Sequence, residues 1–136
     1  MKKRNNWFIF AYPEMYGGLH GMYNYDVAYN LTYDEVCEWA FELAYETVES
    51  YLRADEIYTE EDFMEDYYDG AEWDDCYKEE YWDAFDEVMQ EQCAFEVYPI
   101  KDGVTEADYI KWQKENMDPK DFIKRYCRQL TDEDCI

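Results

Sequence analysis

The pattern of hydrophobic and polar positions predicts strands on both sides of a helical middle region. Trp7–Tyr12 is almost entirely aromatic and aliphatic and stops at Pro13, which is typical of a strand. Ala94–Ile100 alternates apolar and polar residues, and Pro99 places it at the edge or the end of a sheet. Met22–Tyr29 alternates more loosely and is a candidate second strand. We expect the two aromatic strands to pair although they are far apart in the sequence.

Apolar residues at helical spacing predict three helices in the middle of the chain. Thr32 and Glu35 form a capping box, in which a hydroxyl at the helix start and a carboxylate three residues later each accept from the other residue's backbone N–H. The helix behind this box is expected over Tyr33–Arg53. A short helix that Thr59 caps is expected over Glu60–Tyr68, and a third helix is expected over Glu72–Gln92.

Two further helices are predicted near the C-terminus. Thr105 begins one that extends to about Asn116, and Asp118 followed by Pro119 opens another that extends to about Leu130. The last six residues, 131–136, are expected to be loose.

This order of elements predicts an α+β fold, with a small β-sheet of two or three strands, about five helices, and acidic helices in the middle of the chain. We interpret residues 1–136 as a single domain. It divides into an acidic helical region over residues 26–97 and a near-neutral C-terminal helical region over residues 98–136.

The charge of the chain is large and concentrated in the middle region. The sequence contains 35 Asp and Glu and 12 Lys and Arg, a net charge of −23. Residues 26–97 hold 25 of the acids and only Arg53 and Lys78, so this region alone carries −23. The 16 Tyr, 7 Phe and 5 Trp argue against disorder, because disordered chains are poor in aromatics. The charge disfavours nucleic acids and anionic membranes as partners and favours a basic protein.

The acids of two predicted helices recur along one helical face. In each helix, five acids are separated by steps of three, four, four and three residues. Like charges at this spacing each cost about 0.2–0.5 kcal/mol in an isolated helix, so stability alone does not explain them. The candidate partner-binding residues are the first stripe Glu35, Glu38, Glu42, Glu46 and Glu49, the second stripe Glu72, Asp75, Glu79, Asp83 and Asp86, the connecting acids Asp62, Glu65, Asp66 and Asp69, and the aromatics Tyr67 and Tyr68.

The density of this charge can be compared with that of DNA. One stripe covers about 21 Å of helix, so it carries a charge every ~5 Å. Duplex DNA carries one charge per ~1.7 Å counting both strands, or ~3.4 Å per strand. One stripe is therefore sparser than a phosphate strand, whereas two neighbouring stripes approach its density. The alternative interpretation is that both stripes are solvated helix faces.

The acidic helices and the acids between them resemble those of DNA-mimicking inhibitors from phages and mobile elements. That class includes anti-restriction proteins, uracil-glycosylase inhibitors and several anti-CRISPR proteins. The resemblance covers residues 26–97 and is one of composition, without a diagnostic motif. It implies a protein that occupies the DNA-binding groove of a bacterial defence nuclease, first of all an RNA-guided CRISPR nuclease, in the host cytoplasm. An anti-restriction DNA mimic, a non-inhibitory acidic virion or assembly protein, and an acidic chaperone for a basic partner are the alternatives.

The sequence offers little for catalysis. His20 is the only histidine, and it lies in the Gly-rich segment 16–21, which lacks a phosphate-binding spacing and predicts a turn. The five cysteines are widely spaced without a CxxC pair, which indicates reduced thiols of a cytoplasmic protein. We therefore expect no enzymatic activity, no metal site and no cofactor.

The last predicted helix carries basic side chains, in contrast to the middle of the chain. We expect them to meet carboxylates of the acidic helices or of a second copy, which leaves a homodimer open. These residues are Lys120, Lys124, Arg125 and Arg128.

Overall fold

Three antiparallel strands form one sheet in the order β2-β1-β3 in the computed structural model, which describes residues 2–14, 21–51, 58–115 and 118–136. The strands are β1 (Asn5–Pro13), β2 (Asn24–Leu31) and β3 (Cys93–Pro99). The described α-helices are α1 (Tyr33–Tyr51), α3 (Glu60–Tyr68), α4 (Lys78–Glu91), α5 (Glu106–Glu115) and α6 (Pro119–Tyr126), with short 3-10 helices η3 (Asp75–Tyr77) and η4 (Asp132–Cys135). The expected α+β fold is confirmed, and so is the pairing of the two aromatic strands, with Ile9 opposite Val97.

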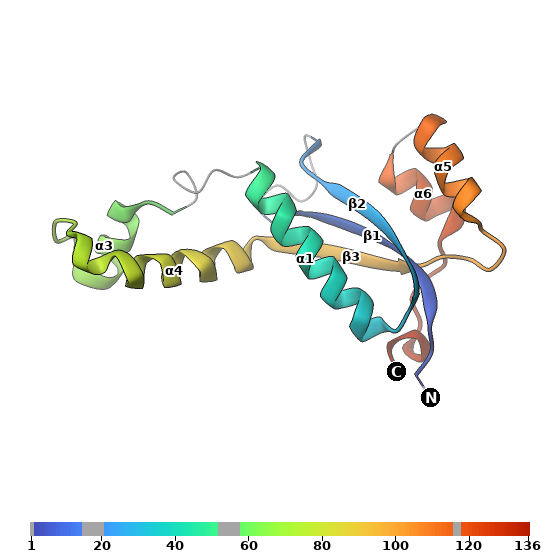
Figure 1. Cartoon of the computed structure of the whole chain (residues 1–136), viewed down its shortest axis with the longest axis horizontal. Helices are drawn as coiled ribbons and strands as arrows, with labels where there is room; N and C mark the ends of the chain where they lie inside the picture. The colour runs from blue at the N-terminus through green and yellow to red at the C-terminus, as the bar shows by residue number, and fades with distance from the viewer. Residues whose placement is uncertain (1, 15–20, 52–57, 116–117) are drawn as a thin grey trace.

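The central strand β1 is buried on both of its faces. Trp7 and Ile9 belong to the apolar cluster that includes α1, whereas Phe8 and Phe10 belong to the cluster on the opposite face, with α5 and α6. The Phe8 ring stacks on the ring of Phe122 of α6 at 4.5 Å. Figure 1 shows α1 crossing the sheet on one side and the α5–α6 pair at its far end. Because both faces are covered, the apolar run of β1 is continuous rather than alternating.

A second part of the molecule extends away from the sheet as an arm, which we define as residues 58–92 and which contains α3, η3 and α4 (Figure 1). It has its own aromatic cluster, in which Phe63 of α3 packs against Tyr81 of α4 at 5.8 Å. Val48 of α1 also belongs to this cluster, so the end of α1 joins the arm to the sheet. Aromatic packing thus extends from the sheet along the arm.

The predicted helix over Glu72–Gln92 was wrong at its start, because α4 begins only at Lys78. The side chain of Asp74 accepts a hydrogen bond from the backbone N–H of Cys76 at 2.9 Å and caps η3 instead. Asp competes with helical bonding in this way, because its short side chain offers the backbone another acceptor. The chain also leaves α3 through two residues of positive φ, Asp69 at 52° and Gly70 at 80°, and then needs an unwound stretch to turn back.

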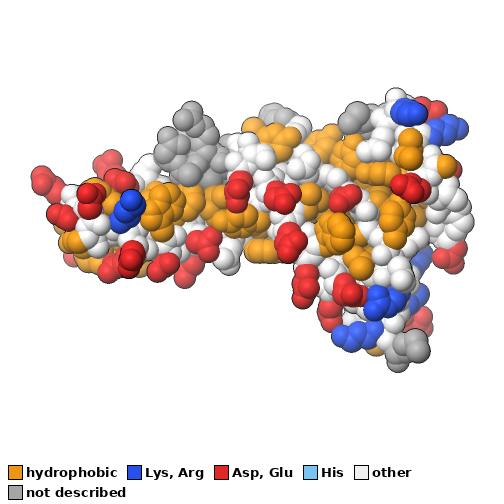
Figure 2. All heavy atoms as spheres, viewed as in Figure 1, with side chains coloured by type: hydrophobic (Ala, Val, Ile, Leu, Met, Phe, Trp, Pro, Cys, Tyr) orange, Lys and Arg blue, Asp and Glu red, His pale blue; other side chains and the backbone are white. Residues whose placement is uncertain are grey.

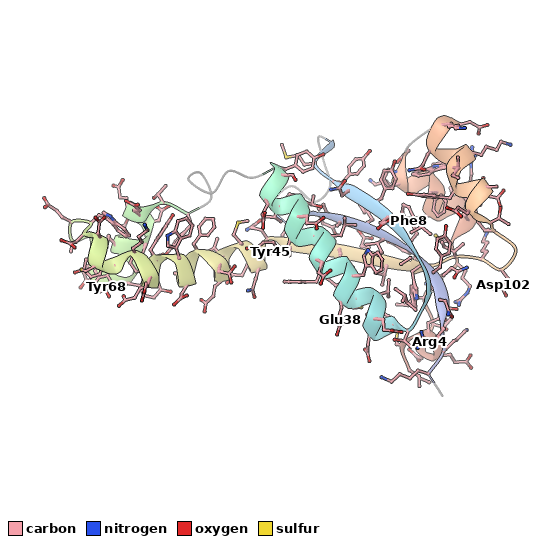
Figure 3. All side chains as sticks on the ribbon, viewed as in Figure 1. Arg4, Phe8, Glu38, Tyr45, Tyr68 and Asp102 are labelled. Atoms are coloured by element: carbon pink, nitrogen blue, oxygen red, sulfur yellow. The ribbon has the colours of Figure 1, made fainter. Side chains whose placement is uncertain are left out.

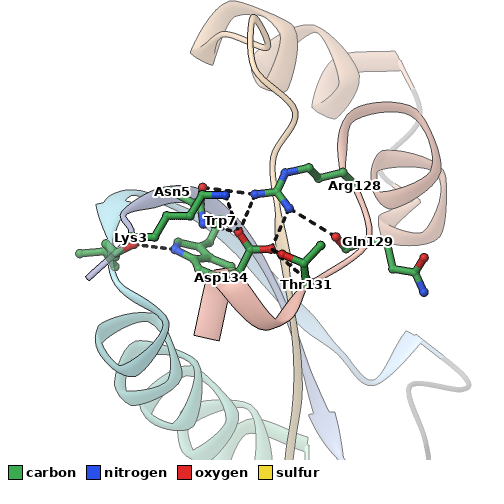
Figure 4. Close-up of polar contacts among 8 residues, drawn as sticks. Lys3, Asn5, Trp7, Arg128, Gln129, Thr131 and Asp134 are labelled. Carbon is green, nitrogen blue, oxygen red and sulfur yellow. Dashed lines mark hydrogen bonds and ion pairs between the residues drawn. The ribbon is translucent and has the colours of Figure 1, made fainter. Parts of the chain in front are cut away.

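The C-terminal residues were expected to be loose, and this was wrong. They form η4, and its Asp134 is 0 % exposed. Arg128 donates two hydrogen bonds of 2.7 Å to the Asp134 carboxylate, Lys3 lies 3.2 Å from it, and Asn5 donates to it at 3.0 Å (Figure 4). The backbone N–H and the hydroxyl of Thr131 also donate to this carboxylate, at 2.9 Å and 2.8 Å. One buried carboxylate therefore ties the end of the chain to the start of β1.

The described basic residues near the C-terminus do not pair with the acidic helices, so the first of their two expected partners is wrong and a second copy stays a prediction. Arg128 pairs with Asp134, and Arg125 pairs with Asp121 one turn away at 3.3 Å. Lys120 and Lys124 have no ion-pair partner among the described residues. The predicted helix also ends early, at Tyr126, because the following segment bonds to the end of β3, with the Arg128 N–H donating to the Pro99 carbonyl at 2.9 Å. Arg125 and Arg128 are therefore used locally, whereas Lys120 and Lys124 are unpaired among the described residues.

We predict that Asp134→Asn lowers the free energy of unfolding by about 2–3 kcal/mol at neutral pH, because hydrogen bonds to a buried charge are lost. The exposed residue Asp132 serves as the control, and Asp132→Asn should change the free energy of unfolding by less than about 0.5 kcal/mol. Hydrogen bonds from Arg128 hold the pKa of Asp134 well below its usual range. The stabilisation is thus complete above the unfolded pKa of about 3.9 and is lost as the pH falls toward the lower folded pKa. Urea unfolding should show the difference between wild type and Asp134→Asn narrowing below about pH 4.

Candidate functional site

The first predicted stripe lies on the solvent side of α1. Glu38, Glu42, Glu46 and Glu49 are all exposed. The opposite side of the helix, with Val36, Ala40, Ala44 and Val48 buried, packs against the sheet and the arm. Figure 3 shows Glu38 pointing away from the sheet. The amphipathic pattern of α1 therefore places a line of carboxylates where a partner can reach them.

Two predicted site residues serve the fold instead. Glu35 accepts from the backbone N–H of Thr32 at 3.0 Å in the expected capping box, and it also pairs with Arg4 at 3.0 Å. Asp62 forms the equivalent capping box with Thr59 at the start of α3. The backbone hydrogen bond is the main cause that lowers the pKa of each carboxyl below its ordinary value. Both groups are committed to helix starts.

The second predicted stripe is shorter than expected. Glu79, Asp83 and Asp86 lie exposed on α4, but Glu72 lies in the unwound stretch and Asp75 in η3, so neither continues the helical face. The connecting acids Glu65, Asp66 and Asp69 are also exposed, on α3 and its end. The exposed acids of the arm are therefore distributed over α3, the unwound stretch, η3 and α4, and they do not form a single line.

The two stripes do not lie side by side. The side chains of α1 and α4 meet where the Tyr45 hydroxyl donates to Asp86 at 3.0 Å, and α4 leads from there into β3 while α1 crosses the sheet (Figures 1 and 3). The prediction that two neighbouring stripes together approach the charge density of DNA is therefore wrong for this fold. The acids form two separate surfaces that meet at the junction of α1 and the arm.

The cations of the described ion pairs all come from the two ends of the chain. Lys2 and Arg4 pair with Asp34 and Glu35 at the start of α1. Lys3 and Arg128 pair with Asp134, and Arg125 pairs with Asp121. The arm holds fifteen Asp and Glu against Lys78 alone, a net charge of −14. On the face shown in Figure 2, red side chains extend along the arm and across α1, and one blue side chain interrupts them on the arm. No exposed carboxylate of the stripes other than Glu35 is neutralised by a described cation.

In the acidic region, tyrosine hydroxyls donate hydrogen bonds to carboxylates that no described cation pairs with. Besides the Tyr45–Asp86 contact, Tyr58 donates to Asp66 at 3.1 Å, and Tyr68 donates to Glu80. Burial raises the pKa of Tyr58 to about 12, and the hydrogen bond to Glu80 raises the pKa of Tyr68 to about 12. Each phenol therefore stays a neutral donor near pH 7. A neutral donor orients a carboxylate without cancelling its charge.

The exposed aromatic side chains only partly match the predicted pair. Tyr67 is 59 % exposed, whereas Tyr68 is half-buried, with its ring 4.4 Å from that of Tyr77. Sequence reasoning missed Trp39 of α1 and Trp82 of α4, which are 47 % and 49 % exposed. A signal existed for Trp82, since it falls among acids rather than in the apolar register of Tyr81 and Phe85.

Other chemistry is sparse in the part of the chain that the structure describes. It contains no group of three His, Cys, Asp or Glu side chains placed to hold a metal ion, and no helix with the length and apolarity to cross a membrane. All five cysteines are free thiols. His20 and most of the predicted turn over 16–21 lie outside the described residues, as does Arg53 at the predicted end of the first helix. Comparisons of the chain with protein-family models, curated proteins and solved structures found no match.

We predict that Tyr68→Phe removes a phenol that ionises near pH 12 and leaves the absorbance change around pH 10 unaltered. Because the folded pKa is raised, the contribution of this bond to stability is present below pH ~10 and is lost as the pH rises through the folded value. The measurement is a pH titration of phenolate absorbance, with Tyr67→Phe as the control on the exposed neighbouring phenol. A smaller absorbance step near pH 10 in Tyr68→Phe than in the wild type would show that Glu80 does not hold this hydroxyl.

Proposed function

We propose that this protein is an acidic DNA mimic that occupies the DNA-binding groove of a bacterial defence nuclease and thereby inhibits it. An RNA-guided nuclease is the first choice of target, and a restriction enzyme is the second. The observation that carries the proposal is the set of exposed carboxylates on α1 and the arm that no described cation neutralises. Surface acids that served only solubility would not need a net charge of −14 on one arm, since about 2–8 charges suffice for a small domain.

The carboxylates act as substitutes for phosphates. Glu42 and Glu46 are one helical turn apart, so their charges repeat at about 6 Å along α1. The phosphates of one DNA strand are ~3.4 Å apart. The carboxylates of α1 therefore reproduce the negative charge and the linear arrangement of the phosphates, but not the position of each phosphate. Lys and Arg side chains are long and can adapt to the wider spacing. Inhibition then follows from competition for the same cations.

The shape of the molecule supports the same function. The 14 residues of α4 extend over about 21 Å, and α3 and η3 complete a narrow projection beyond the sheet (Figure 1). A projection of this kind can enter a groove that is built to hold a nucleic-acid duplex. The α1 surface would remain at the mouth of that groove, where its charges guide the encounter.

The test is a titration of DNA cleavage by purified RNA-guided nucleases and restriction enzymes. Wild-type protein should block cleavage at about one-to-one stoichiometry for one of these classes. Neutralising the α1 surface by Glu38→Gln, Glu42→Gln, Glu46→Gln and Glu49→Gln together should weaken inhibition at least about tenfold, while Glu42→Gln alone should be nearly silent. Raised salt should slow association of the wild type more than that of the quadruple variant.

A matched control separates the α1 surface from net charge. Glu106→Gln, Glu115→Gln, Asp132→Asn and Glu133→Gln change the total charge by the same amount on exposed residues of the C-terminal region. This variant should inhibit within about twofold of the wild type. Equal losses in both quadruple variants would assign the effect to total charge alone. No loss in either variant, or no inhibition of any nuclease by the wild type, would contradict DNA mimicry.

A further inference from the structure

A groove between α3 and α4 combines an apolar floor with acidic walls. It has a volume of about 260 Å³ and is lined by Phe63, Tyr67, Glu80, Asp83, Ala84 and Glu87. Phe63 and Ala84 are almost completely buried and form the floor. The Tyr67 ring stands 5.1 Å from that of Phe63 and is the exposed aromatic face of the groove.

The three carboxylates of the groove stand on one side of α4, at steps of three and four residues. The hydroxyl of Tyr68 donates to Glu80 and fixes its position. Asp83 and Glu87 have no hydrogen-bond or ion-pair partner among the side chains that the structure describes. The walls therefore hold three negative charges beside an aromatic ring, and Asp83 and Glu87 are free to pair with a group of another molecule.

We propose that this groove binds an arginine side chain of a basic partner protein. Arginine fits both halves of the groove, because its planar guanidinium stacks on aromatic rings and bonds carboxylates in bidentate geometry. A lysine ammonium also pairs with carboxylates, but it is strongly hydrated and lacks the planar face. A second copy of this chain suits the groove less well, since it carries a net charge of −23 and its described arginines, Arg4, Arg125 and Arg128, are already paired with acids.

This inference rests on the proposed function, because it names the side chain of the target protein that the arm contacts. It adds an anchor with defined chemistry to a surface that otherwise acts through its summed field. Contacts made by exposed aromatic and arginine side chains are the ones that most often dominate protein interfaces. The groove therefore predicts a preference for arginine over lysine, which charge alone does not produce.

The test compares a ten-residue arginine peptide with a ten-residue lysine peptide of equal charge, with binding measured by calorimetry. Wild-type protein should bind the arginine peptide more tightly, and Tyr67→Ala should reduce the ratio of the two affinities by about threefold or more. Tyr67→Phe keeps the ring and should keep the ratio. Tyr67 is largely exposed, and circular dichroism verifies that both variants fold.

Two charge variants with the same spacing complete the experiment. Asp83→Asn with Glu87→Gln removes the acidic wall and should lower the arginine-to-lysine ratio. Glu42→Gln with Glu46→Gln removes an i,i+4 pair of carboxylates from α1. It should weaken the binding of both peptides by the same factor and leave the arginine-to-lysine ratio unchanged. The proposal is overturned if Tyr67→Ala keeps the wild-type ratio, if Tyr67→Phe loses it, or if the two charge variants behave alike.

The proposal of an arginine groove and the proposal of DNA mimicry can be contradicted independently, because the peptide affinities test the first and nuclease inhibition tests the second. If the wild type inhibits no nuclease but keeps a ratio that depends on Tyr67, DNA mimicry fails and the arginine groove stands. If the wild type inhibits a nuclease and the ratio does not respond to Tyr67, the groove fails and DNA mimicry stands.

Discussion

Residues 26–97 carry a net charge of −23, and the rest of the structure has to overcome the repulsion that this charge creates. Each like-charge pair one turn apart on a helix costs only about 0.2–0.5 kcal/mol. A fully buried Phe contributes about 1.5–3 kcal/mol, so Phe63 in the arm offsets several such pairs. The aromatic content and the acidity of the chain are therefore linked. The rings of the arm hold together a segment that its charges would separate.

The protein treats buried and exposed carboxylates in opposite ways. Asp134 is fully buried, and Arg128 and Lys3 pair with it, because a buried charge without a counter-charge would be strongly unfavourable. Asp86 and Glu80 are exposed on the arm and receive tyrosine hydroxyls instead. Neutral donors there fix the side chains and leave the charge available to a partner. Lys or Arg at the same positions would stabilise the arm more and would cancel the field that the proposed function needs.

Local signals in the sequence were sufficient for most of the elements. The capping boxes at Thr32 and Thr59, and Asp118 before Pro119, fix helix starts by hydrogen bonds within a few residues, and the structure has all three. The start of α4 was misplaced because the Asp74 cap competes with the helix and because Trp73 packs against Phe63 at 6.3 Å, a contact that only the folded arm creates. The buried C-terminal carboxylate could not be predicted, since Asn5 and Asp134 lie at opposite ends of the chain.

The same distinction between local and distant contacts applies to the candidate site. Exposure of the α1 acids follows from the amphipathic pattern of one helix, so the sequence could predict it. The angle between α1 and α4 depends on how α4 leads into β3, and no pattern within either helix contains that information. The groove beside Tyr67 also needs α3 and α4 folded together, which is why Glu80 and Glu87 escaped the analysis of stripes.

The divergence of α1 and the arm has a consequence for how the acidic surfaces act. At physiological ionic strength, charges more than about 8 Å apart are largely screened from each other in solvent. The two surfaces meet at Tyr45 and Asp86 and then separate, so most of their carboxylates do not repel those of the other surface. An elongated fold thus tolerates a charge that a compact one would oppose more strongly. In the proposed function, the target would engage α1 and the arm as two contacts, which favours a long groove over a small basic patch.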